Sequence, residues 1–181
     1  VVHRVGNGGR YFWRRVEHGK FHTLRDRIIQ EVLLSLEVAK EILVELKNGD
    51  RGVAEKYLSQ LTGLGAESAD CYGSLIYLND FEKAKNSFVE ARLCDLYGLD
   101  KYFATYNETQ NPFYLKLEAA NLYYTQNYLN LAEKDILALI KEKDSYRDAH
   151  LLASKIYEKL GDQARANEHK QKAQQIDQIK L

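Results

Sequence analysis

Apolar residues recur along most of the chain at spacings of three and four, the period of an α-helix with one buried face. The pattern is clearest in residues 113–180, where helix-like stretches are separated by short joins at Asn127-Tyr128 and Gly161-Asp162. Asparagine and glycine tolerate left-handed backbone angles, so these joins predict tight turns between helices. Because β-branched residues do not cluster in alternating runs, the pattern predicts an all-α protein.

The C-terminal half repeats itself with a period of 34 residues. Residues 113–146 and 147–180 align without gaps. Small residues early in each second helix would let paired helices approach closely, and a tyrosine four residues before each turn would fill the space between neighbouring pairs. The aligned pairs that support this reading are Ala119 with Ala153, Tyr123 with Tyr157, and Ala132 with Ala166.

These small residues, tyrosines and turns resemble the tetratricopeptide repeat family. The resemblance covers residues 113–180 and, with fewer matches around Asn79-Asp80-Phe81 and Ala84, residues 65–98. It implies a right-handed α-solenoid of antiparallel helix hairpins with an atypical N-terminal helix pair. We therefore expect a basic, aromatic segment at 1–21, a helical hairpin at 22–64, and repeats at 65–181 interrupted by an insertion near 99–112.

The resemblance also implies a non-enzymatic scaffold or adaptor that binds a peptide or helix of a partner protein in a concave groove. Tyrosines on one side of this groove and lysines on the other would suit an apolar, acidic peptide. The expected groove residues are Tyr77, Tyr114, Leu117, Asn121, Tyr124, Lys155 and Lys159.

The net charge is zero only for the whole chain. Residues 1–28 carry seven basic and two acidic side chains, and their net charge is therefore +5. Tyr11, Phe12 and Trp13 precede Arg14 and Arg15, a mixture that suits single-stranded nucleic acid or an anionic membrane surface. Arg10, Arg14 and Arg15 are the candidate contacts to an anionic ligand, and a nucleic-acid-binding helical protein is the alternative function.

Two further alternatives remain open. Residues 24–58 look similar to the opening helices of translin-like RNA-binding proteins, which would support the nucleic-acid reading. The chain would also suit a regulatory domain of a larger protein.

No catalytic constellation, metal site or cofactor motif stands out in the sequence. His18 and His22 have the spacing of metal ligands on a helix, but no third ligand beyond Glu17 accompanies them. Cys71 and Cys94 form no CxxC motif, so we expect reduced, buried thiols in a cytoplasmic protein. No stretch is long and apolar enough to span a membrane.

Overall fold

The structure is a computed structural model, and it describes residues 24–66, 68–80, 82–84, 98–99, 102–103 and 111–179. All regular elements in these ranges are helices, and no strand occurs there. The prediction of an all-α protein is therefore confirmed for the described part of the chain.

Helices α1 and α2 are joined by a turn that the sequence specifies locally. Helix α1 spans Leu24–Asn48 and α2 spans Arg51–Gly63. Gly49 has a φ of +83°, a left-handed conformation that glycine adopts without a side-chain clash. The Asp50 carboxylate then caps α2 by accepting a hydrogen bond of 3.0 Å from the Val53 backbone N–H. A short helix α3, Ala69–Ile76, follows and packs against α2.

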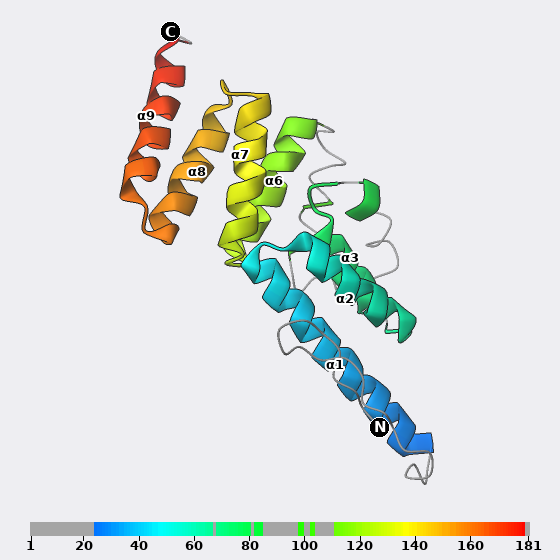
Figure 1. Cartoon of the computed structure of the whole chain (residues 1–181). Coiled ribbons are helices and arrows are strands. Elements are labelled where there is room, and N and C mark those ends of the chain that lie inside the picture. Colours follow the sequence, from blue (N-terminus) through cyan, green and yellow to red (C-terminus); the bar gives the residue numbers. More distant parts are fainter. Residues whose placement is uncertain are drawn as a thin grey trace. The chain divides into compact units, whose positions relative to one another are not determined.

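The C-terminal part consists of four successive helices: α6 at Pro112–Thr125, α7 at Leu129–Glu142, α8 at Arg147–Leu160 and α9 at Gln163–Ile179 (Figure 1). Each packs against the next along the chain. Asn127 and Gly161, which lie in the turns that follow α6 and α8, have φ values of 63° and 80°. The predicted turns at these residues are therefore confirmed.

Small and aromatic side chains fill the core between these four helices. Ala132 and Ala166 are 0% and 1% exposed, so they lie inside the packed helix pairs as the sequence predicted. Tyr123 and Tyr157 are buried as well. Four large aliphatic side chains of α7 and α8 are also fully buried: Leu131, Ile136, Leu139 and Ile156.

The chain divides into two compact units, Val1–Leu36 and Glu37–Leu181. The first unit contains the N-terminal half of α1, and the second contains the remaining described helices.

None of the described helices has the length and apolar character needed to cross a bilayer.

Cys71 is buried as expected, but it is disulfide-bonded, so the prediction of a reduced thiol there was wrong. Sequence spacing does not report which thiols approach within bonding distance.

Candidate functional site

A largely buried polar cluster is formed by Arg51, Tyr123 and Asp135. Arg51 is the first residue of α2, Tyr123 lies on α6 and Asp135 on α7. The Arg51 Nη2 atom lies 2.5 Å from Asp135 Oδ2, and the two side chains are only 19% and 11% exposed. The same guanidinium lies 5.1 Å from the centre of the Tyr123 ring, a distance at which a cation and a π-system attract each other. This Arg51 cluster joins three helices that are distant in sequence.

Tyr123 is held in the cluster by its hydroxyl group as well as by its ring. The hydroxyl donates a hydrogen bond of 2.6 Å to the Leu75 carbonyl oxygen at the end of α3. Burial raises the pKa of Tyr123 well above its ordinary value, although the nearby Arg51 guanidinium opposes that shift. The residue is therefore a neutral, fully buried hydrogen-bond donor.

Burial also shifts the pKa of the acidic partner. It raises the pKa of the Asp135 carboxyl above its usual range, while the hydrogen bond and charge of Arg51 act in the opposite direction. The Arg51 Nε atom is buried and has no hydrogen-bond partner among the described residues. The guanidinium consequently depends on Asp135 and on the Tyr123 ring for its stabilisation.

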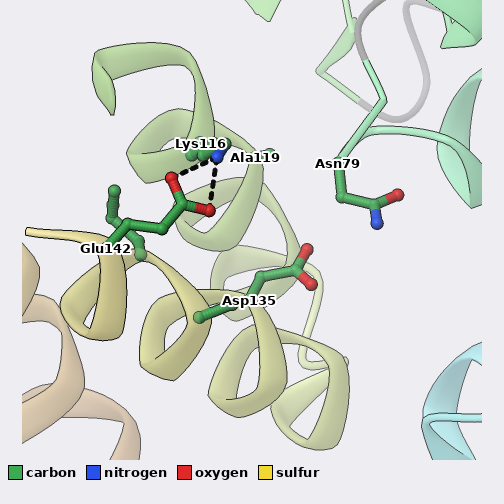
Figure 2. Close-up of a pocket in the computed structure, with 7 residues that line it drawn as sticks. Asn79, Lys116, Ala119, Asp135 and Glu142 are labelled. Carbon is green, nitrogen blue, oxygen red and sulfur yellow. Dashed lines mark hydrogen bonds and ion pairs between the residues drawn. The ribbon is translucent and has the colours of Figure 1, made fainter. Parts of the chain in front are cut away.

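A small hollow of about 170 Å³ opens beside Asp135 between α6 and α7 (Figure 2). Lys116 and Glu142 close one side of it through a double contact of 2.5 and 2.6 Å between the ammonium group and both carboxylate oxygens. The Asn79 side chain lies across from the Asp135 carboxylate. The residues lining the hollow are Asn79, Lys116, Ala119, Asp135, Ala138, Leu139 and Glu142.

The charges of this region balance one another. Arg51 is paired with Asp135, and Lys116 is paired with Glu142, so the hollow offers no excess charge to an anionic or cationic ligand. No group of three or more histidine, cysteine, aspartate or glutamate side chains in the described ranges is arranged to hold a metal ion. The Arg51–Asp135 pair therefore links α2 to α7, and the Lys116–Glu142 pair links α6 to α7.

A second polar cluster lies between α8 and α9, where two histidine rings face each other. The Nδ1 atoms of His150 and His169 are 2.9 Å apart. The Nε2 atom of His150 lies 2.9 Å from the Asp144 carbonyl oxygen, which can only accept a hydrogen bond, so this nitrogen carries a proton. When His150 is neutral its Nδ1 is therefore an acceptor, and His169 must donate from its own Nδ1. Burial, and then the neighbouring His150, lower the pKa of His169 below its ordinary value.

The predicted groove residues occupy several different environments. Tyr124 and Lys159 do come together, with the lysine Nζ atom 4.3 Å from the centre of the tyrosine ring. Leu117 is 8% exposed and belongs to the core of α6, whereas Lys155 is exposed on α8. Tyr77 is half-buried and has the Lys83 ammonium 5.3 Å from its ring centre.

Tyr114 and Asn121 are half-buried on α6. The assignment of these groove residues to a partner surface stays a prediction. Arg10, Arg14 and Arg15 lie outside the described residues.

The residues that make the two polar clusters were not singled out as a group from the sequence. Arg51 and Asp135 are separated by 84 positions, and nothing in their local sequence links them. The 34-residue repeat does place His150 in a first helix and His169 in a second, but it does not show that their rings meet.

Comparison with known proteins gives a different family from the one that the repeat pattern implied. A family model described as Ribonuclease H-like matches residues 1–59, which is about one third of the chain, and no tetratricopeptide repeat family model matches. No curated protein and no solved structure matches. The resemblance to tetratricopeptide repeats, and the scaffold function derived from it, are therefore corrected.

The physical reason for this error lies in what the pattern reports. Small residues at helix crossings and glycine or asparagine at turns occur wherever antiparallel helices pack closely, whatever the family. The matched stretch instead contains the basic, aromatic residues 1–23 together with α1 and the first nine residues of α2. The Ribonuclease H-like match favours a nucleic-acid-related function, which is the alternative function that the sequence predicts.

Proposed function

We propose that this protein binds single-stranded nucleic acid through its basic, aromatic N-terminal segment, residues 1–28. The observation that carries the proposal is the Ribonuclease H-like match, because residues 1–59 include this entire segment. The net charge of +5 in the same residues supports it.

Electrostatics confine the binding to this end of the chain. Residues 29–153 carry a net charge of −7, which repels a phosphate backbone, whereas residues 1–28 attract it. Lysine and arginine side chains that neutralise phosphates release condensed counterions, and this release drives association at low salt. The acidic part of the molecule thus directs the nucleic acid to the basic segment.

The aromatic residues favour a single strand over a duplex. Tyr11, Phe12 and Trp13 can stack on unpaired bases, and each base–aromatic stack contributes about 1–3 kcal/mol. Bases in a duplex are already stacked on their neighbours and offer no free face. Arg14 and Arg15 directly follow these aromatics and are suited to the adjacent phosphates.

We further propose that the chain acts by binding and does not itself cleave the strand. Two-metal hydrolysis requires carboxylates gathered around the scissile phosphate. The described acidic residues of the matched stretch form no such group, and Glu31, Glu37 and Glu41 are distributed along a single helix. The successive helix pairs α6–α7 and α8–α9, which share the 34-residue period, would form a solenoid-like array that carries the binding segment.

Fluorescence anisotropy with a labelled 20-nucleotide single strand tests the proposal. We expect saturable binding at low salt, weaker binding to the matching duplex, and at least tenfold weaker binding by a variant with Arg10→Ala, Arg14→Ala and Arg15→Ala. A matched control removes three exposed lysines from the second unit through Lys56→Ala, Lys155→Ala and Lys170→Ala, and it should bind like the wild type.

Two results would contradict the proposal. Equal losses in both triple variants would show that the binding is not located in the N-terminal segment. Cleavage of the strand by the wild type in the presence of Mg²⁺ or Mn²⁺ would contradict the binding-only part.

A further inference from the structure

The N-terminal half of α1 displays an unusual amount of apolar surface. Six large aliphatic side chains between residues 24 and 36 are each 44–69% exposed. Isolated exposed leucines are common on proteins, but a contiguous group of this size marks a surface that another molecule covers. The six residues, which we call the α1 stripe, are Leu24, Ile28, Ile29, Val32, Leu33 and Leu36.

Helix geometry places the α1 stripe on one side of α1. Leu24, Ile28, Val32 and Leu36 follow each other at intervals of four residues, and Ile29 and Leu33 form the adjacent row. Gln30 lies on the opposite side of the helix. The stripe therefore forms an apolar face along one side of the helix, while Gln30 and Leu34, which is 37% exposed, lie on the other side.

The order of residues along this stripe makes it complementary to itself. Its main row is symmetric about Gln30, so that a second copy in antiparallel orientation would place Leu24 against Leu36 and Ile28 against Val32. Every apolar side chain of the row then meets an apolar side chain. A two-fold axis requires this kind of self-matching, and the antiparallel arrangement also opposes the two helix dipoles.

The available area is sufficient for a specific pair. Six aliphatic side chains that are each about half exposed offer on the order of 500 Å² per copy, so a pair would bury about 1,000 Å², the lower limit for a specific protein interface.

We propose that the α1 stripe is a homodimerisation surface and that two copies of this chain pair through it as antiparallel helices. The dimer carries two basic N-terminal segments and can therefore hold one strand at two points, which strengthens binding without any new contact. The pairing itself does not depend on nucleic acid and is tested in its absence.

Sedimentation velocity of the full chain over a range of micromolar concentrations gives the first test. We expect a species of about twice the 20.9 kDa chain mass, and at least a tenfold weaker dimer in the Val32→Glu variant. Val44→Glu is the matched control, because Val44 lies on the same helix, is 47% exposed compared with 53% for Val32, and is outside the stripe. Circular dichroism of both variants checks that they keep their helices.

A charge exchange tests the orientation. Leu24→Lys and Leu36→Glu should each weaken self-association, whereas an equal mixture of the two variant chains should pair again because the antiparallel arrangement sets the lysine against the glutamate. A mixture that stays monomeric overturns the antiparallel pairing. A monomeric wild type, larger aggregates without a discrete dimer, or equal disruption by Val32→Glu and Val44→Glu would overturn the proposal as a whole.

Discussion

At the scale of single residues, the facing rings of His150 and His169 make the α8–α9 contact dependent on protonation. One proton is shared between two Nδ1 atoms 2.9 Å apart, and a second proton would place two N–H groups against each other. Several charged groups surround the pair. Asp144 precedes α8, and its carboxylate lies 3.5 Å from His150 Nε2; Lys172, Glu168 and Arg165 lie on α9. Lys172 is itself paired with Asp144 at 2.9 Å.

We predict that the protein loses stability as the pH falls below about 6.5, the ordinary pKa of histidine. The pKa of His169 is lowered in the folded state, so the unfolded chain binds more protons and acid favours unfolding. His169 is partly exposed, so we limit the effect to about 1 kcal/mol, or roughly 2–4 °C in melting temperature between pH 7.5 and 5.5.

The matching variant is His169→Gln, which retains a polar side chain but does not titrate. Its melting temperature should change less over the same pH range than that of the wild type. An unchanged pH dependence in this variant would show that the histidine pair is not the group responsible.

At the scale of the elements, the start of α7 is tied to the turn between α1 and α2 by several independent contacts. Lys134 donates a hydrogen bond of 2.6 Å to the Gly49 carbonyl oxygen, and Asn130 donates to the Lys47 carbonyl oxygen at 3.3 Å. Gly49 approaches α7 so closely that an added Cβ would lie 2.9 Å from Asn130 Cβ. The Arg51–Asp135 ion pair is the buried centre of this junction.

We predict that Asp135→Ala destabilises the fold by about 3–5 kcal/mol, because it leaves the Arg51 charge buried without its carboxylate. The double variant Arg51→Met with Asp135→Leu removes both charges and should recover much of this loss. Urea unfolding of the wild type, the Arg51→Met and Asp135→Leu single variants and their double variant measures the coupling. Additive losses would mean that the pair does not act as a unit.

The sequence predicts the helices of this molecule better than it predicts their junctions. Asn127 and Gly161 mark turns by their backbone chemistry, and Ala132 and Ala166 mark close crossings by their size, because each signal is local. The Arg51–Asp135 pair depends on how chain segments 84 residues apart meet, and no local pattern encodes that meeting.

The local character of sequence patterns also explains why the resemblance to tetratricopeptide repeats was wrong. A repeated pattern of small residues and turns describes helix packing, which many unrelated sequences share. The Ribonuclease H-like match instead lies at the opposite end of the chain, over residues 1–59. Charge and aromatic content did single out this end as a candidate nucleic-acid-binding segment, but they did not point to a Ribonuclease H-like match.

At the scale of the whole molecule, the uneven distribution of charge is the property that the proposed function uses. Residues 1–28 carry a net charge of +5 and residues 29–153 a net charge of −7, and residues 154–181, at +2, bring the whole chain to zero. Such a molecule should hold a phosphate backbone at its N-terminal segment, as the proposed function requires.

The salt dependence of single-strand binding measures how many phosphates the N-terminal segment contacts. For the wild type, the logarithm of the binding constant should fall linearly with the logarithm of the salt concentration. Each phosphate contact contributes about 0.7 to the slope, so replacing Arg10, Arg14 and Arg15 by alanine should reduce its magnitude by roughly 2. Two results would contradict phosphate binding by the N-terminal segment. One is binding that does not depend on salt, and the other is a slope that these three replacements leave unchanged.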